Sequence, residues 1–171
     1  DDTAFLLLNR EDLVTVSRLV KAHFRKFGLT VHCGDKRVEN SKSKTEVMFI
    51  PGNGIEATPE DTEDIMLNSH EYFSFCDTFK YLGTTFTSDL DDSADIKKRI
   101  QKASGAFYKM SKVLKDPNVS HKMRIRAYEA NVLNMLLFGC ESWALKKEDR
   151  RKLEACHHKF LRSMLGISML Q

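Results

Sequence analysis

The 171-residue sequence lacks any hydrophobic run long enough to cross a membrane. Its most apolar stretches, Phe5–Leu8 and Val132–Phe138, are far shorter than the roughly 18 residues that a membrane-spanning helix needs. The first residues also lack the basic segment, apolar segment and cleavage site of a signal peptide. We therefore expect an intracellular protein that is neither secreted nor embedded in a membrane.

Cysteine is sparse and widely scattered. Cys33, Cys76, Cys140 and Cys156 are spaced as reduced intracellular thiols usually are, and not as a disulfide framework. No two of them form a Cys-x-x-Cys pair, so the residues Cys156–His158 give little support for a zinc site. Phosphate-binding loops and dinucleotide-binding fingerprints rich in glycine are absent as well.

The composition is that of a folded domain, but the charge is unevenly distributed. Hydrophobic residues make up 42% and charged residues 30% of the chain, which is long enough for one domain or two small ones. Residues 1–94 hold 10 Lys and Arg against 17 Asp and Glu, a net charge of −7. Residues 95–171 hold 17 against 7, a net charge of +10. The basic half either holds a polyanion or simply carries cations on solvated helix faces.

The first half of the chain has a mixed helical and extended pattern. The apolar run that follows Asp1 and Asp2 is strand-like as far as Leu8. Asn9, with an aspartate three residues later, predicts the N-cap of an amphipathic helix over residues 10–27 that ends at Gly28. We expect loops at 34–44 and 56–64, and further strands at 29–32, 45–50, 72–75, 79–82 and 84–87.

From Asp92 onward the apolar residues recur at helical spacing. The pattern predicts one helix from Asp92 to just before Pro117, a second capped by Ser120, and a third from about Lys147 to Gly166. Three helices with one apolar face each predict a small bundle. The fold class predicted is therefore α+β, with a sheet-containing domain over residues 1–92 and a helical domain over residues 93–171.

Short segments along the whole chain resemble, in the same order, reverse transcriptases of non-LTR, LINE-like retrotransposons. The resemblance implies that residues 1–92 are the C-terminal part of a polymerase palm and that residues 93–171 are the thumb. The segments that carry it are Asp1–Leu6, Phe27–Leu29, Ser43–Met48, Phe79–Gly83, Asp95–Ile100, Phe138–Trp143 and Phe160–Ile167.

The resemblance implies a catalytic role for the first two residues. Asp1 and Asp2 match the end of the family's aromatic-x-Asp-Asp motif, which implies that they are metal ligands. With a further aspartate upstream they would hold two Mg²⁺ ions, which prefer oxygen ligands and activate the primer hydroxyl. Because the chain begins with Asp and not Met, we expect a fragment that is inactive as a polymerase by itself.

Two further sites follow from the resemblance. Lys44, in a Lys-Thr motif before a strand, is expected to contact the triphosphate of the incoming dNTP; the alternative is a solvated lysine beside a strand. The loop before Lys44 is longer than in many relatives, which leaves its position open. The other site matches the turn that grips the primer strand, although an aromatic turn in a protein core is the alternative. Its residues are Phe79, Lys80, Tyr81, Leu82 and Gly83.

The basic helices would hold the duplex of RNA template and DNA primer through its phosphates, by contacts that are independent of sequence and weaken with salt. Glu141 and Trp143 are instead expected to fix a turn between helices. The residues expected to bind nucleic acid are Lys97, Lys98, Arg99, Lys102, Lys109, Lys112, Lys122, Arg124 and Arg126.

The function implied is that of an RNA-directed DNA polymerase of a retroelement, located in the nucleus and cytoplasm. The alternative is a non-catalytic remnant of a decayed retroelement that binds nucleic acid. The sequence leaves open whether this copy is intact or expressed, its target site, an associated endonuclease domain and the oligomeric state.

Overall fold

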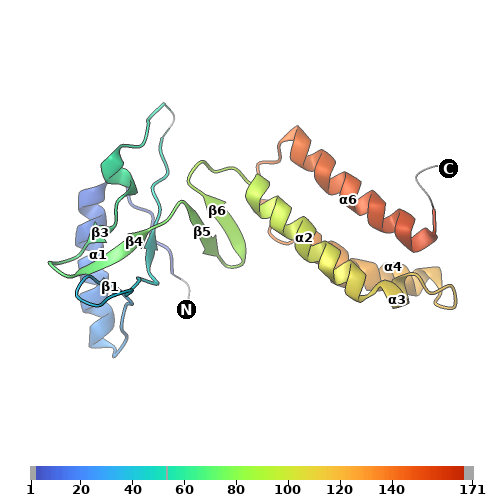
Figure 1. The fold of residues 1–171 in the computed structure, drawn as a ribbon, viewed down its shortest axis with the longest axis horizontal. Helices are drawn as coiled ribbons and strands as arrows, with labels where there is room; N and C mark the ends of the chain where they lie inside the picture. The colour runs from blue at the N-terminus through green and yellow to red at the C-terminus, as the bar shows by residue number, and fades with distance from the viewer. Residues whose placement is uncertain (1–2, 53, 168–171) are drawn as a thin grey trace. The chain divides into compact units, whose positions relative to one another are not determined.

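The computed structural model describes residues 3–52 and 54–167, which form two compact units. Unit 1 is the chain up to Leu82 together with Phe86–Leu90, and unit 2 is Gly83–Thr85 together with the chain from Asp91 onward. Unit 1 contains one long helix and short strands, whereas unit 2 is mainly helical (Figure 1).

Helix α1 (Arg10–Lys26) begins and ends where the sequence predicts. The Asn9 side chain accepts a hydrogen bond from the backbone N–H of Asp12 at 2.7 Å, which satisfies one of the free donors of the first turn. At the other end Gly28 has a φ of +73°, and the N–H of Leu29 donates to a carbonyl of the last turn at 3.0 Å. This arrangement is a Schellman motif, so both predicted caps are confirmed.

Strand β4 (Glu71–Phe75) is the centre of a small sheet in unit 1. Strands β1 (Gly34–Asp35) and β3 (Ile65–Met66) pair with it antiparallel, and β2 (Glu46–Val47) pairs with it parallel. Helix α1 lies along this sheet (Figure 1), and its Leu13 and Val14 pack on the core side chains. Among the described residues of this unit that core has three buried hydrophobic members, Ile65, Leu67 and Phe73.

Strands β5 (Thr78–Tyr81) and β6 (Thr84–Thr87) form a separate two-stranded sheet close to the predicted positions. The two-residue turn between them consists of Leu82 and Gly83, with φ of +47° and +88°. Positive φ at both positions is what a type I′ hairpin turn requires. Glycine adopts it freely, whereas for Leu82 the left-handed conformation is uncommon.

Two predicted strands are absent. Residues 3–8 and 29–32 form no strand, and β1 lies instead inside the segment expected to be a loop. A strand needs a neighbour that supplies backbone hydrogen bonds, and no described strand pairs with residues 3–8. The acidic segment 56–64, expected to be only a loop, contains a short 3₁₀ helix at Pro59–Thr62.

The helices of unit 2 follow the predicted order but are more broken. The first predicted helix is divided at Met110, and a π-helical turn at Glu129–Leu133 interrupts the second. The caps at Ser120 and Gly166 are confirmed, since the Ser120 hydroxyl accepts from a first-turn N–H and Gly166 has a φ of +71°. The helices are α2 (Ser93–Lys109), α3 (Ser111–Leu114), α4 (His121–Tyr128), α5 (Asn134–Leu136) and α6 (Lys147–Leu165).

The core of unit 2 is built from the apolar faces of these helices. The rings of Phe107 on α2 and Phe160 on α6 stack with centroids 4.6 Å apart, and Tyr128 packs edge-on against Phe160. Val132 and Leu136 are also buried in this cluster. Burial of a large apolar side chain stabilises a fold by roughly 1.5–3 kcal/mol, so this cluster supplies most of the stability of the unit.

The observed elements confirm the α+β fold class. Within the part of the chain that the structure describes, no helix is both long enough and apolar enough to cross a membrane.

Candidate nucleic-acid interface

A buried ion pair organises unit 2. Asp95, at the start of α2, is only 1% exposed and pairs with Arg99 one turn later, Nε to Oδ2, at 3.4 Å. Its carboxylate also accepts hydrogen bonds from the backbone N–H of Thr85 at 3.1 Å and from Nε1 of Trp143 at 3.2 Å. A carboxylate removed from water needs several such donors, because unpaired buried charge is strongly destabilising.

Arg99 extends this network to two other segments. Its Nη2 donates to the carbonyl oxygen of Gly83 at 2.6 Å, and its guanidinium carbon lies 4.5 Å from the ring centroid of Phe138. Gly139 follows with a φ of +80°, and a Cβ there would lie 2.8 Å from the Thr84 hydroxyl. Only glycine fits this position without strain.

Three of the segments that carry the family resemblance therefore meet at one ion pair. Phe79–Gly83 contributes the Gly83 carbonyl, Asp95–Ile100 contributes both charges, and Phe138–Trp143 contributes the aromatic ring and the indole N–H. The structural role expected for Trp143 is confirmed. The role of Asp95 was not predicted, although its spacing of four from Arg99 on a helix is an ion-pair signal.

Seven of the nine cations expected to bind nucleic acid have exposed side chains. These are Lys97, Lys98, Lys102, Lys109, Lys112, Lys122 and Arg126. The other two, Arg99 and Arg124, are only 4% and 7% exposed. We leave both out of the interface because their guanidinium groups are held inside unit 2.

Arg124 supports the end of α6. Its Nη1 donates to the carbonyl oxygen of Met164 at 2.9 Å, and its Nη2 lies 2.9 Å from Nδ1 of His121. The last carbonyls of a helix lack partners within the helix and carry partial negative charge, so a cation there is stabilising. Arg124 therefore has a structural role, which is to stabilise the end of α6.

Three exposed lysines share one face of α2. At about 100° per residue, Lys98, Lys102 and Lys109 fall within about 40° of one another around the helix. Gly105 lies between them on the same face, and a Cβ built there would meet nothing within 4 Å. A glycine inside a helix is about 1 kcal/mol less favourable than alanine, so neither packing nor stability explains it.

The predicted triphosphate contact, Lys44, has an exposed side chain just before β2. Its backbone N–H donates to Nδ1 of His32 at 3.1 Å. The buried hydroxyl of Ser43 lies 2.7 Å from the carbonyl oxygen of Thr45 and 3.1 Å from that of His32, either of which can accept its hydrogen. These bonds fix the backbone on either side of Lys44 while its ammonium group faces solvent.

The predicted primer-grip residues lie on one hairpin. Phe79 and Tyr81 are two residues apart on β5, and their rings stack with centroids 6.3 Å apart. Lys80 and Leu82 are exposed, whereas the carbonyl of Gly83 is bound by Arg99. The hairpin thus presents a cation and an apolar side chain to solvent.

The predicted metal ligands Asp1 and Asp2 lie outside the described residues. Elsewhere in the described chain, no group of three His, Cys, Asp or Glu side chains could hold a metal ion. The spacing of residues in the sequence also gives little support for zinc at Cys156–His158. His157 is engaged otherwise, with its Nδ1 2.7 Å from the Tyr128 hydroxyl.

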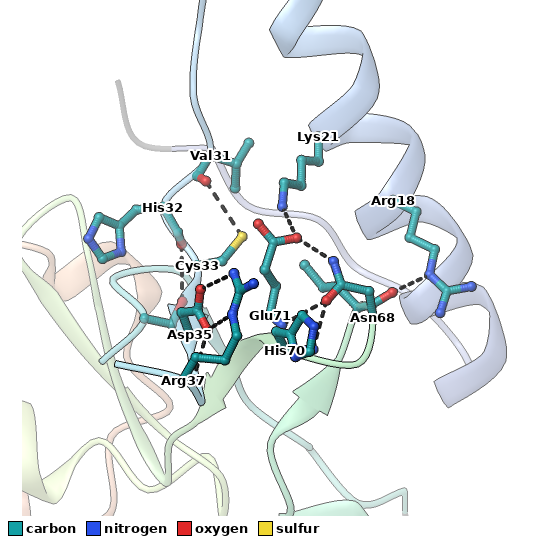
Figure 2. A network of polar contacts seen from close by, with 12 residues as sticks. Arg18, Lys21, Val31, His32, Cys33, Asp35, Arg37, Asn68, His70 and Glu71 are labelled. Carbon is teal, nitrogen blue, oxygen red and sulfur yellow. Dashed lines mark hydrogen bonds and ion pairs between the residues drawn. The ribbon is translucent and has the colours of Figure 1, made fainter. Parts of the chain in front are cut away.

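A polar network holds α1 to the sheet in unit 1, as Figure 2 shows. Lys21 forms an ion pair with Glu71 at the start of β4, and Nε of Arg18 donates to the carbonyl of Leu67 at 2.7 Å. Cys33 lies in this network with its thiol donating to the carbonyl of Val31. Burial raises the pKa of the Cys33 thiol, which makes it a poor nucleophile.

The comparisons with known proteins point to a mobile element. A transposon-derived, uncharacterized protein of Caenorhabditis elegans is 26% identical to this chain over 95 residues. The matched part is 56% of this chain and 34% of the relative, so it spans about a third of that protein's length. No protein-family model matches the chain, and no solved structure matches it. The similarity supports a transposon origin.

Proposed function

We propose that this chain is part of the RNA-directed DNA polymerase of a non-LTR retroelement, and that unit 2 holds the template–primer duplex by its phosphates. The observation that carries the proposal is the lysine face of α2, in a helical unit whose chain segment from residue 95 has a net charge of +10. Phosphate contacts supply most of the sequence-independent affinity for nucleic acid.

Gly105 supports the same surface. A phosphate backbone that crosses α2 between Lys102 and Lys109 would approach the helix most closely where no side chain stands. Glycine allows such an approach because it has no side chain. Stronger binding of the duplex would offset the helix stability of about 1 kcal/mol that glycine loses relative to alanine. The proposal therefore explains a residue that the packing of unit 2 leaves unexplained.

In this proposal the residues of the other half serve the chemistry. Asp1 and Asp2 contribute to a site for Mg²⁺, Lys44 contacts the triphosphate, and the hairpin Phe79–Gly83 contacts the primer. Two bound Mg²⁺ ions would activate the primer hydroxyl and neutralise charge on the transferring phosphate. Metal-dependent primer extension tests this part, in a protein where the chain is joined to an upstream segment that supplies the further aspartate. There Asp1→Asn should lower turnover far more than duplex affinity.

The duplex-binding part is tested with the chain itself. Its affinity for an RNA–DNA duplex should be independent of sequence, and four or five engaged cations give a slope of log K against log salt of about −4. The double charge reversal Lys102→Glu with Lys109→Glu should flatten this slope by about two units.

A matched control is available on α6. Lys147 and Arg151 are exposed, four residues apart and outside the proposed surface. Their double reversal to glutamate changes the net charge equally but should leave the slope nearly unchanged. A wild-type slope near zero, or equal slopes for the two double variants, would refute phosphate binding by α2.

Gly105→Ala gives a second, independent test. The substitution should raise the stability of unit 2 by up to about 1 kcal/mol and at the same time weaken duplex binding. A structural glycine would show the opposite or no effect on stability. Unchanged affinity in the stabilised variant would rule out a close approach of the duplex at this point.

A further inference from the structure

An open pocket lies beside the lysine face of α2. It has a volume of about 390 Å³, and all of its lining residues belong to unit 2. This volume is within the range of small-molecule sites. Helix α2 forms one wall, and the π-helical turn together with α5 forms the other. Within helices, π-helical turns are frequent at functional sites. The lining of the pocket includes Arg99, Lys102, Asn131, Asn134 and Phe138.

An aromatic ring is available in this pocket. The Arg99 guanidinium carbon lies 4.5 Å from the centroid of the Phe138 ring, yet Phe138 remains 52% exposed. The ring is therefore held in place by Arg99, with Gly83 beside its edge, and still has exposed surface for a second planar group. Stacking on such a ring is tolerant of base identity, because every base has a π face.

Polar groups of the right kind surround the ring. The side-chain amides of Asn131 and Asn134 donate to the carbonyls of Ala127 and Ala130, at 2.9 and 3.4 Å. Each bond uses one N–H of the amide, so the second N–H and the amide oxygen are the groups that could contact a ligand. Lys102 adds an exposed positive charge at the rim.

We propose that this pocket receives one unstacked base of a single-stranded nucleic-acid segment, with the base on Phe138 and the adjoining phosphate near Lys102. The aromatic ring, amide groups and a cation occur together here, and this combination suits a nucleotide unit. A base inside a duplex cannot reach the ring, so the site selects single strands. This inference rests on the proposed function, since it extends the same nucleic-acid surface.

The experiment measures binding of the 171-residue chain to a single-stranded oligonucleotide and to a duplex of equal length. Phe138→Ala should weaken single-strand binding about tenfold and leave duplex binding within twofold, because only the single strand loses a stacking contact. Tyr108→Ala is the matched control: Tyr108 is an α2 aromatic that is 64% exposed and outside the pocket. Phe138→Trp keeps a planar ring and should restore the affinity.

Fluorescence of 2-aminopurine, placed at successive positions of the oligonucleotide, gives a direct readout. Quenching at one position with wild type and not with Phe138→Ala supports the site. Equal single-strand affinity for Phe138→Ala and Tyr108→Ala, with duplex binding intact, would overturn this inference while sparing the proposed function. Loss of both affinities in a variant whose Trp143 fluorescence is native would also overturn it. Failure of the wild-type chain to bind any nucleic acid would instead refute the proposed function.

Discussion

The two units of this chain reach stability by different means. Unit 1 buries few apolar side chains: α1 buries only Ser17, and hydrophobic residues such as Leu19 and Phe27 stay more than 60% exposed. Polar contacts, such as the ion pair between Lys21 and Glu71, connect α1 to the sheet. Unit 2 buries a continuous cluster that includes Phe107, Phe160 and Trp143.

This difference in buried apolar area predicts a difference in the free energy of unfolding of the two units. Stability comes chiefly from buried apolar area, and exposed ion pairs add little to it. We therefore expect unit 1 to be weakly stable and unit 2 to be robust. Trp143, the single tryptophan, reports on unit 2 alone, and hydrogen exchange of β4 amides reports on unit 1.

The largest expected effect is that of Phe73→Ala in unit 1. Phe73 is one of the three buried hydrophobic residues in its cluster, and Phe→Ala in a core costs about 3–5 kcal/mol. We expect β4 amides to lose their protection from hydrogen exchange completely. The midpoint of urea unfolding, followed by Trp143 fluorescence, should not change. A shift in that midpoint would show that the two units do not fold separately.

Asp95→Ala is expected to lower the stability of unit 2 strongly without unfolding it completely. It leaves the buried guanidinium of Arg99 without its partner and removes the acceptor of the Trp143 indole, a loss of about 3–5 kcal/mol. The Trp143 urea transition should move to much lower urea. Glu154→Ala, also in unit 2, is the control, because its ion pair with Arg150 is exposed and should matter little. Similar shifts for both variants would contradict the role given to Asp95.

The smallest expected effect is a difference between the two units in how their stability depends on pH. Burial, and then the neighbouring His158, lower the pKa of His157 below its ordinary 6.5. The unfolded chain therefore binds this proton more readily, and unit 2 loses stability as pH falls below 6.5. In unit 1 the hydrogen bond from Lys21 lowers the pKa of Glu71 below 4.5, so its contribution is lost only under more acidic conditions.

Urea unfolding at pH 7.5 and 5.5, followed by Trp143 fluorescence, checks this difference. The midpoint should fall modestly at pH 5.5 for the wild type. His157→Gln does not titrate and can still bond with the Tyr128 hydroxyl, so its midpoint should fall less. An equal fall for both proteins would assign the pH dependence to other groups.

Much of the helical architecture could be predicted from the sequence, because caps are local signals. Asn9, Gly28, Ser120 and Gly166 each act within one turn of their own helix, and all four were predicted correctly. Strands depend on partners that lie far away in sequence. The wrong strands at residues 3–8 and 29–32 show that an apolar extended pattern does not reveal whether a partner exists.

The candidate interface was predictable only in part. The sequence does not reveal whether a lysine or arginine on a helix is buried or exposed. Arg99 and Arg124 are buried, whereas Lys102 is exposed. What separates them is the presence of distant acceptors, such as the Gly83 and Met164 carbonyls. The pocket at Phe138 was missed for a similar reason, since residues about 35 positions apart form its two walls.

The central claim is that unit 2 holds the duplex through the lysine face of α2. Lysine modification of the chain, with and without an RNA–DNA duplex at low salt, tests it most directly. We predict that the duplex protects Lys98, Lys102 and Lys109 strongly, and that Lys36 and Lys42 of unit 1, both exposed, react equally in both conditions. Equal protection of all five lysines, or no protection on α2, would contradict the claim.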